Sequence, residues 1–386
     1  MVKTMVRART AVVVTALALA AGCSGNDEPS ASSTTPGTTS APTTAGTTSA
    51  PSSSAPSSTA AAQGPVKLTV ASTVATGIEV PWGLAFLPDK SALVSERDSS
   101  KIKRIAGGQV SEVGEVDDVD ASSEGGLLGL AVDPQYPTRP YIYAMYTSGD
   151  DNRIARLTYR NNQLSDQQVI LDGIQKAAIH NGGRLRFGPD GYLYVGTGEA
   201  GDRPNAQDDN SLGGKILRIT TDGKAAPGNP GGRLWLSKGH RNVQGLAFDG
   251  KQLYASEFGQ STWDELNVIT AGANYGWPAA EGIDSLDGMT NPIAVWKPAD
   301  ASPSGIAFAQ GHIFMASLRG ERLWAIPVAN GKRTGEPQAF FVGEFGRLRT
   351  VETAPDGSLW LTTSNTDGRN DPRDGDDRIL RITISR

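Results

Sequence analysis

HNGGRLRFGPDGYLYVGTGEAGD, residues 180–202, contains two short strands joined by a tight GPDG turn. Proline, aspartate and glycine favour a turn because each supplies a backbone geometry or a local hydrogen bond that turns need. His180, one of only three histidines in the chain, stands at the entrance to this strand-turn-strand unit. The stretch therefore predicts a β-hairpin with a scarce ionisable residue at its start.

The same strand-turn-strand unit recurs along the chain. Its six copies are WGLAFLPDKSALVSER, GLLGLAVDPQYPTRPYIYAMYTSGD, GRLRFGPDGYLYVGTGEAG, QGLAFDGKQLYASEFGQ, SGIAFAQGHIFMASLRGERL and RTVETAPDGSLWLTTSN. Equivalent positions lie about 46 to 61 residues apart and are Phe86, Val132, Phe187, Phe248, Phe308 and Ala354. A period of this length is typical of repeat architectures, in which each copy is one supersecondary unit.

A third strand follows the hairpin in most copies: KIKRI, RIARLTY, KILRIT, ERLWAI and RILRITI. Their alternating polarity is typical of half-buried strands. Together these patterns predict an all-β fold, a six-bladed β-propeller of four-stranded antiparallel blades. A pair of β-sandwiches is the alternative, which the regular spacing disfavours. We expect RILRITI to close the ring against the N-terminal segment VKLTVASTVATGI.

The N-terminal residues predict export. A basic segment (3–9) and an apolar run (11–21) precede small residues and Cys23, the sole cysteine. LAAGC resembles a bacterial lipobox, so residues 1–22 are predicted to be a lipoprotein signal peptide and Cys23 the lipidated residue. Ordinary signal-peptidase cleavage is the alternative. The expected location is outside the cell, lipid-anchored to the outer face of the cell membrane.

Composition and charge indicate the bounds of the folded domain and exclude some kinds of site and partner. Residues 23–64 consist almost wholly of Ser, Thr, Ala, Pro and Gly, which predicts a disordered tether and leaves 65–386 for the propeller. Without a second cysteine we expect no disulfide and no thiolate metal site. The net charge of −5 argues against a nucleic-acid partner. The lipid anchor is the only membrane contact we expect.

Propeller geometry predicts where the polar residues meet. The first strand of each blade lines the central channel, so residues before the first strand and after the second share the channel mouth. Those before it are Glu124, His180, Asn181, Arg241, Asn242, Arg347 and Arg349; those after it are Glu96, Arg97, Glu199, residues 257–260, Arg319 and Asn365. Because arginine pairs with carboxylates and phosphates, this rim predicts a flat polyanionic ligand.

Each of these residues also has a purely structural interpretation. A lone arginine in a propeller is usually a surface or blade-pairing residue, and a lone histidine is more often structural than catalytic. Convergence from different repeats onto one face favours a functional role, because solvation alone does not select one face. His240 and His312 fit the rim less well.

The chain resembles the soluble-glucose-dehydrogenase-like family, the aldose sugar dehydrogenases that use pyrroloquinoline quinone (PQQ). The matching runs are PWGLAFLPD, EGGLLGLAVDP, HNGGRLRFGPDGYLYVGTGEAGD, SLGGKILRI, GHRNVQGLAFD, SEFGQSTWDELN, GANYGWP and SPSGIAF. They follow the family's order and span nearly the whole predicted propeller. The resemblance implies a six-bladed propeller that oxidises an aldose at its anomeric carbon to a lactone.

The resemblance also implies roles for individual residues. His180 matches the catalytic base, and Glu199 stands where the family has an aspartate that orients or assists this histidine. Glu124 lies near a residue that contacts the quinone in some members, where a carboxylate would repel the cofactor unless protonated or paired. The remaining implied cofactor-binding residues are Arg241, Asn242, Arg319, Arg347 and Arg349. Arg319 replaces a lysine usual in the family.

Calcium is the second cofactor that the resemblance implies. Gly259 and Gln260 match two backbone carbonyls that bind the active-site Ca²⁺. Carbonyl oxygens are suitable ligands for this hard cation. Glu265 and the backbone of Tyr275 match part of a second, structural Ca²⁺ site.

Three functions follow from these observations. The first is PQQ-dependent oxidation of an aldose, with an electron acceptor that the sequence does not name. The second is a non-catalytic surface propeller lipoprotein that binds a glycan or a protein through the same rim. The third is a Ca²⁺-dependent lactonase, which would need no quinone. A fold hosts many functions, so the site must decide among them.

Overall fold

The computed structural model describes residues 64–284 and 286–386. The predicted signal peptide (1–22), Cys23 and, apart from Gly64, the predicted tether (23–64) lie outside the described residues. Within them, no helix is long and apolar enough to cross a membrane.

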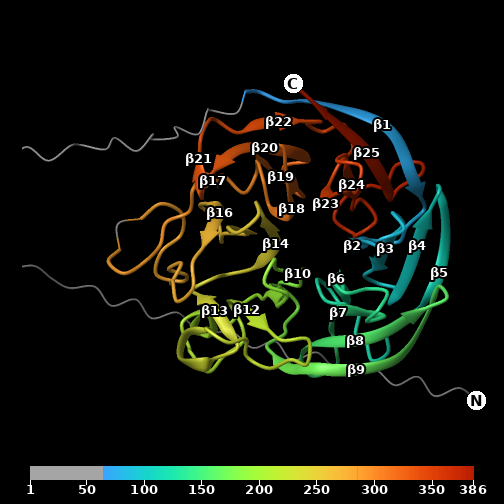
Figure 1. Ribbon diagram of the computed structural model, residues 1–386. Helices are drawn as coiled ribbons and strands as arrows, with labels where there is room; N and C mark the ends of the chain where they lie inside the picture. Colours follow the sequence, from blue (N-terminus) through green and yellow to red (C-terminus); the bar gives the residue numbers. More distant parts are fainter. Residues whose placement is uncertain (1–63, 285) are drawn as a thin grey trace, which may run out of the picture. The chain divides into compact units, whose positions relative to one another are not determined.

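Six antiparallel sheets form the blades of a propeller arranged around a central axis (Figure 1). Blade 1 consists of β2 (Pro81–Phe86), β3 (Ala92–Glu96), β4 (Lys101–Ala106) and β5 (Gln109–Glu115). Blade 2 consists of β6 (Leu127–Val132), β7 (Tyr141–Thr147), β8 (Asn152–Arg160) and β9 (Gln163–Ile174). Blade 3 consists of β10 (Leu185–Phe187), β11 (Leu193–Gly196), β12 (Lys215–Ile219) and β13 (Trp235–Lys238).

The other three sheets complete the ring. Blade 4 consists of β14 (Val243–Phe248), β15 (Leu253–Glu257), β16 (Asp264–Ile269) and β17 (Ala294–Trp296). Blade 5 consists of β18 (Pro303–Ala309), β19 (His312–Ser317) and β20 (Arg322–Ala329), with both β21 (Lys332–Arg333) and β22 (Gln338–Phe340) pairing with β20. Blade 6 consists of β23 (Leu348–Thr353), β24 (Leu359–Thr363), β25 (Arg378–Ser385) and β1 (Lys67–Thr76).

The predicted six-bladed, all-β architecture is confirmed. Five blades have four strands and blade 5 has an additional short one, because two separate segments pair with β20. In the described part of the chain the helical elements are two 3₁₀ turns, η1 (Arg203–Ala206) and η2 (Pro230–Gly232).

The hairpin of residues 180–202 forms as predicted. Strand β10 pairs antiparallel with β11, with Phe187 opposite Leu193. In the turn, Gly191 has φ +78°, which glycine adopts without a Cβ penalty. The Asp190 carboxylate accepts a hydrogen bond from the Tyr192 N–H at 3.3 Å. This local chemistry ends the first strand and reverses the chain.

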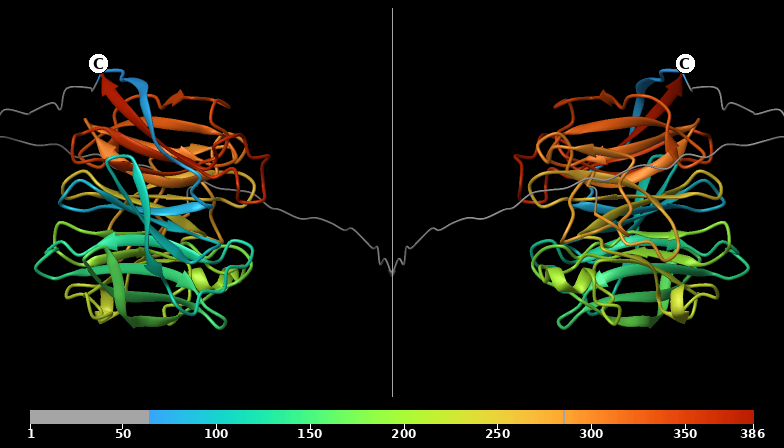
Figure 2. Two further views of the ribbon diagram at one scale, coloured as in Figure 1. Left: turned by 90° about the vertical axis from the view of Figure 1, so that its right-hand side faces the viewer. Right: turned by 90° about the vertical axis from the view of Figure 1, so that its left-hand side faces the viewer.

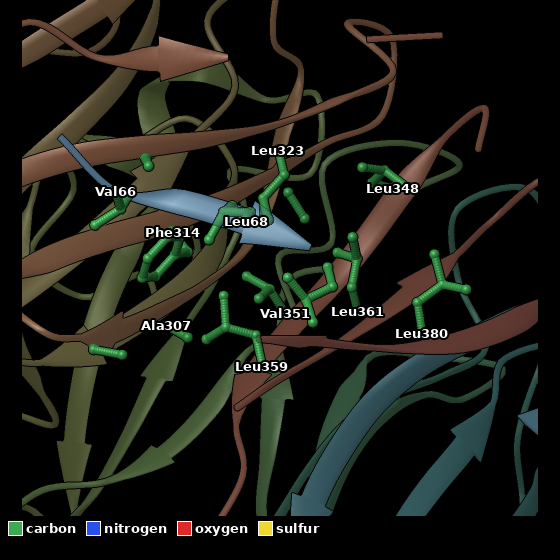
Figure 3. Close-up of a cluster of buried hydrophobic side chains, with 14 residues drawn as sticks. Val66, Leu68, Ala307, Phe314, Leu323, Leu348, Val351, Leu359, Leu361 and Leu380 are labelled. Atoms are coloured by element: carbon green, nitrogen blue, oxygen red, sulfur yellow. The ribbon is translucent and has the colours of Figure 1, made fainter. Parts of the chain in front are cut away.

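The two ends of the described chain close the ring, as the sequence predicted. Strand β1 pairs antiparallel with β25, with Lys67 opposite Ser385 and Thr76 opposite Arg378. Both side views show β1, in blue, running beside β25, in dark red (Figure 2). Val66 and Leu68 join the hydrophobic cluster of blades 5 and 6, which contains Phe314, Leu323, Leu348, Val351, Leu359, Leu361 and Leu380 (Figure 3). Burial of these side chains supplies the driving force for closure.

A β-bulge interrupts the innermost strand of five blades at an equivalent point. The register shifts precede Leu84, Leu130, Gly245, Ile306 and Val351. Bulges re-aim side chains and are frequent beside active sites. Here they lie just after the mouth-side start of each inner strand, so they set the direction of the side chains at the channel mouth.

Candidate functional site

A pocket at the channel mouth gathers side chains from five blades. It is lined by Trp82, Arg97, Glu124, Gln244, Phe258, Leu318, Arg349, Asp367 and Arg369. These residues lie at the starts of inner strands or just after second strands, as the repeat predicts. Among the charged side chains of the lining, three are arginines and two are carboxylates.

His180 and Glu199 form a buried pair beside this pocket. His180 Nδ1 lies 2.6 Å from Glu199 Oε1, and their side chains are 11% and 1% exposed. Because an ionised carboxylate only accepts hydrogen bonds, this contact favours the neutral tautomer with the proton on Nδ1 and the lone pair on Nε2. Glu199 is one methylene longer than the aspartate expected there, yet it reaches the imidazole.

The backbone around His180 is unusually constrained. His180 has φ +60°, a left-handed conformation that costs energy for residues with a Cβ. A Cβ at Gly198 would lie 1.8 Å from the His180 carbonyl oxygen, so only glycine allows this approach. The Asn242 side chain accepts the Gly182 N–H at 2.9 Å, which holds the same segment. Glycines and one asparagine therefore keep His180 in this position.

Glu124 is paired with a cation. The carboxylate therefore meets the condition under which the sequence predicts no repulsion of an anionic cofactor. It accepts the His180 N–H at 3.0 Å and a hydrogen bond from Arg369 Nη2 at 2.8 Å. Burial raises the pKa of Glu124, but the hydrogen bond from Arg369 and that from the His180 N–H outweigh burial and hold the pKa below its usual value. Glu124 is thus an anion whose charge Arg369 balances.

Arg347 and Arg349 share one carboxylate, Asp367. Arg347 Nη2 and Arg349 Nη2 lie 3.0 and 3.2 Å from Asp367 Oδ2, and the Asp367 side chain is 1% exposed. Burial, opposed by Asp367 and reinforced by Arg97 and Arg347, lowers the pKa of Arg349 to about 10. Two guanidinium groups on one carboxylate leave positive charge unbalanced, which favours binding of an anion.

Arg241 and Gln260 contact each other on the opposite side of the mouth. Arg241 Nη2 and Nε donate to Gln260 Oε1 at 2.9 and 3.2 Å, and the Arg241 N–H donates to Glu257 Oε2 at 2.8 Å. The guanidinium also lies 5.4 Å from the Trp277 ring centroid. Burial lowers the pKa of Arg241. No carboxylate lies within ion-pairing distance of this guanidinium in the described part of the chain.

Glu281 organises the loop that carries Gly259 and Gln260. One oxygen of its carboxylate, Oε1, accepts the backbone N–H groups of Gln260, Ser261, Thr262 and Trp263 at 2.8–3.1 Å. Burial raises the pKa of Glu281, but these four hydrogen bonds outweigh it and hold the pKa below its usual value. The Gly259 N–H donates to Asp264 Oδ1 at 2.9 Å, so the loop is held by two side-chain carboxyl groups, with Glu281 accepting four of the five bonds.

A second polar cluster lies beneath this loop. A small cavity is lined by ten residues, among them Gly259, Glu265 and Tyr275. Asn267 Nδ2 donates to both Glu257 Oε1 and Glu265 Oε2 at 3.0 Å. Burial and the neighbouring Glu257 raise the pKa of Glu265 to about 8. The crowding of carboxyl groups suits a cation, although no cluster of three or more His, Cys, Asp or Glu side chains among residues 64–284 and 286–386 is arranged as a metal site.

The three histidines have different surroundings. His240 is fully buried, with Nδ1 2.8 Å from Glu257 Oε1, and the other oxygen of that carboxylate accepts the Arg241 N–H. His312 begins β19, next to the turn at the far end of β18, and its Nδ1 lies 3.1 Å from the Gln310 carbonyl oxygen. Their poor fit to the rim in the sequence agrees with these positions.

The structure brings together all but one of the predicted cofactor-binding residues. Arg319 is exposed on the turn after β19 and forms no hydrogen bond or ion pair with any residue that the structure describes, although its neighbour Leu318 lines the pocket. The cofactor-binding roles of all six residues, Glu124, Arg241, Asn242, Arg319, Arg347 and Arg349, stay predictions. Asp367, Arg369 and Glu281 were not assigned roles from the sequence. The first two follow the second strand of blade 6, where the repeat rule would have placed them.

Comparison with known proteins agrees with this fold and shows the family. The chain is a six-bladed propeller with a histidine–carboxylate pair beside an arginine-rich channel mouth. These features define its general class as a propeller protein with an ionisable site at the mouth of the channel. The family profile described as Glucose / Sorbosone dehydrogenase matches residues 78–380. The chain therefore belongs to the glucose/sorbosone dehydrogenase family, and the predictions of its family and of an oxidoreductase are confirmed.

Three relatives illustrate the similarity. The PQQ-bound form of aldose sugar dehydrogenase (Adh) from Streptomyces coelicolor is 53% identical, covers 84% of this chain and 100% of that chain, and superposes with a TM-score of 0.83. Aldose sugar dehydrogenase YliI of Escherichia coli K12 is 31% identical over 75% of this chain and 89% of that protein. Quinoprotein glucose dehydrogenase B of Acinetobacter calcoaceticus is 32% identical over 62% of this chain and 59% of that protein.

Proposed function

We propose that this chain is a PQQ-dependent aldose dehydrogenase that oxidises the anomeric carbon of a sugar to a lactone. The observation that carries the proposal is the buried His180–Glu199 pair beside a mouth pocket rich in arginine. The similarity to a PQQ-bound aldose sugar dehydrogenase supports it.

The donor set of the mouth fits PQQ, a planar quinone with three carboxyl groups. Arg347 and Arg349 approach one carboxylate together, and Arg241 has only neutral side-chain partners. Arginine binds carboxylates through paired N–H donors, so these groups would hold the cofactor's carboxylates and quinone oxygens. When bound, PQQ supplies the acceptor for the hydride from the sugar.

His180 supplies the proton chemistry. Its Nε2 is free to accept the proton of the anomeric hydroxyl, because Nδ1 is occupied by Glu199. Glu199 fixes the ring orientation and stabilises the imidazolium that forms. Glu199 Oε2 is buried and has no hydrogen-bond partner among the described residues. That oxygen remains available to a water or to the substrate.

Backbone carbonyls of Gly259 and Gln260 would hold the Ca²⁺ ion of this site. The Glu281 carboxylate accepts N–H groups of the same loop, and the carbonyl oxygens of Gly259 and Gln260 accept no hydrogen bond from another described residue. A divalent cation there would polarise an oxygen of the bound quinone. Glu265 and Tyr275 would contribute to a second, structural Ca²⁺ site.

Replacement of Glu281 by Gln should lower the affinity for Ca²⁺ by about tenfold or more, because charge-assisted hydrogen bonds contribute about 1.5–3 kcal/mol each and the variant weakens four of them. Calorimetric titration of Ca²⁺ into the variant measures this. The exposed Glu112→Gln serves as the matched control and should bind Ca²⁺ like the wild type. An unchanged dissociation constant in Glu281→Gln would show that the loop does not depend on Glu281 for cation binding.

Removal of divalent cations should abolish PQQ binding. After treatment with a chelator, Ca²⁺ should restore binding better than Mg²⁺, because backbone carbonyls suit the larger ion with its flexible coordination. Fluorescence titration with PQQ after addition of each metal measures the recovery. Recovery with Mg²⁺ alone, or no effect of chelation, would contradict the calcium assignment.

The function itself is tested with the full chain. It is titrated with PQQ and Ca²⁺ and then assayed on a panel of aldoses with an artificial redox dye, since the natural electron acceptor is not identified. Turnover with a lactone as product supports the proposal. Saturable PQQ binding without turnover on any sugar would favour the non-catalytic binding propeller. Lactone hydrolysis that needs Ca²⁺ but no PQQ would favour the lactonase.

For its location, we propose export and lipid anchoring through Cys23 on the outer face of the cell membrane. The LAAGC sequence and the sole cysteine support this. Cys23→Ser should release the protein from the membrane fraction. A variant that stays in that fraction would contradict the anchor.

A further inference from the structure

The inner strands carry an arginine where most other blades carry glycine. When the inner strands are aligned on the apolar residues Leu84, Leu130, Leu185, Leu246, Ile306 and Val351, the preceding position holds Gly83, Gly129, Arg184, Gly245, Gly305 and Thr350. The next inward-facing position holds Ala85, Ala131, Arg186, Ala247, Ala307 and Glu352. At these two positions blade 3 thus places two arginines into the channel, where the other blades place Gly, Ala, Thr and a single Glu352.

Arg184 crosses the channel beneath the mouth pocket. Its Nε donates to the Gln244 carbonyl at 2.8 Å and its Nη2 to Thr350 Oγ1 at 3.0 Å, while the guanidinium carbon lies 4.4 Å from the Trp82 ring centroid. Nη1 donates to no residue of the described chain. Arg184 is 7% exposed.

Among the residues that the structure describes, Arg184 also has no carboxylate within ion-pairing distance. The nearest acidic group, Glu352, is held by both Nη atoms of Arg186 at 2.8 and 2.9 Å. Burial lowers the pKa of Arg184 to about 9, and the neighbouring cations Arg186 and Arg349 act in the same direction against Glu352. The guanidinium is still charged at neutral pH. A buried charge without a counter-charge is costly, so the channel carries one uncompensated positive charge.

A cavity adjoins this charge on the side away from His180. It has a volume of about 250 Å³ and is lined by Arg184, Arg186, Glu352 and apolar residues such as Leu84 and Leu130. It shares Arg186 and Glu352 with a wider opening that reaches turn residues, including Pro189 and Gly250, at the far ends of the inner strands. This route to Arg184 is separate from the mouth pocket.

We propose that the channel binds a small monovalent anion, such as a halide, against Arg184 Nη1. A monovalent anion would balance the single uncompensated positive charge of Arg184. An anion of higher charge would be repelled more strongly by Glu352. The cavity has room for the ion and several waters, since a water occupies about 30 Å³. The anion enters from the face opposite the proposed sugar site, and the proposal does not depend on PQQ.

Bromide is the probe for this site. Crystals of the chain soaked in sodium bromide should show an anomalous peak within hydrogen-bonding distance of Arg184 Nη1. In solution, sodium chloride should raise the melting temperature saturably relative to sodium methanesulfonate at equal ionic strength, by about 2 °C or more. Both measurements use the wild-type chain without added PQQ, so failure of the proposed function leaves them valid.

Three variants separate a specific site from a general salt effect. Arg184→Gln should abolish the chloride-dependent rise and Arg184→Lys, which keeps the charge, should retain part of it. The matched control Arg381→Gln, at a surface arginine paired with Asp356, should respond like the wild type. Absence of the bromide peak, or a chloride response in Arg184→Gln equal to that of the wild type, overturns the proposal. A bromide peak with no chloride response in solution means binding at crystal concentration only and also overturns it. If Arg184→Gln does not fold, the wild-type peak and the Lys variant decide.

Discussion

Turnover should fall by about 10²–10⁴-fold when His180 is replaced by alanine, the usual contribution of a positioned general base. The loss should appear in kcat, because the imidazole accepts a proton only as the reaction proceeds. PQQ affinity should stay within a few-fold of the wild type, since the arginines of the mouth are retained. Dye-linked assays on one reactive aldose, with cofactor binding measured separately, give both values.

The backbone at position 180 requires a second variant. His180 has φ +60°, which alanine tolerates less well than asparagine does. His180→Asn should therefore keep the loop conformation and lose turnover to the same extent as His180→Ala. Glu199→Gln should cause a smaller loss, because it removes the charge that stabilises the imidazolium but leaves Nε2 in place.

His312→Ala is the matched control, since this histidine lies far along the blade from the mouth. It should leave kcat unchanged. If His180 were merely structural, its replacement would lower the melting temperature and leave the rate per folded molecule as in the wild type. That pattern in both His180 variants would make the catalytic assignment wrong.

The fold could be predicted because the repeat leaves few alternatives. Six hairpins with strong turn chemistry, most of them followed by an alternating strand, fit one closed architecture. Even the closure of β25 on β1 was predictable from two alternating segments at the ends of the chain. The extra strand of blade 5 was not, because β21 has only two residues and β22 only three. Segments this short have no periodicity to read.

The site could be predicted only in part. The repeat locates residues at the mouth, and the histidine is found because it is scarce. The hydrogen-bond partners of the side chains could not be predicted, because they depend on the geometry of loops from different blades. Glu124 and Arg369 pair over 245 residues of sequence, and no pattern in either loop indicates it. Likewise, Glu281 shows its role only once four N–H groups are seen to converge on it.

PQQ affinity should fall by about 10²-fold or more when both Arg347 and Arg349 are replaced by alanine. Each charge-assisted hydrogen bond to the cofactor is expected to contribute about 1.5–3 kcal/mol, and each 1.4 kcal/mol corresponds to about tenfold in affinity. The structure adds a second reason. Asp367 would lose both of its cationic partners and would present an unpaired carboxylate to an anionic ligand.

Replacement of both arginines should also lower the stability of the fold, so a further variant is needed to separate this effect from cofactor binding. Removing the partners of a buried carboxylate costs about 3–5 kcal/mol, and Asp367 is 1% exposed. At present Arg349 and Arg347 hold the pKa of Asp367 below its usual value against the opposing effect of burial. The ion pairs therefore stabilise the fold above the pKa of the unfolded carboxyl group, and this contribution is lost as the pH falls through the folded pKa. In the double variant the two arginines no longer oppose burial, and only hydrogen bonds such as that from the Arg369 N–H still do, so this pH-dependent stabilisation should shrink.

Adding Asp367→Asn to the double variant separates cofactor binding from folding. The triple variant lacks the buried charge, so its melting temperature should recover toward that of the wild type. Its PQQ affinity should remain well below the wild-type value, because the two guanidinium donors are still missing. If affinity recovers together with stability, the arginines serve only to neutralise Asp367, and the quinone does not bind to them. If the affinity of the stable triple variant stays low while Ca²⁺ binding is unchanged, the arginine pair is a direct contact of the cofactor, since the loop of Gly259 and Gln260 then remains intact.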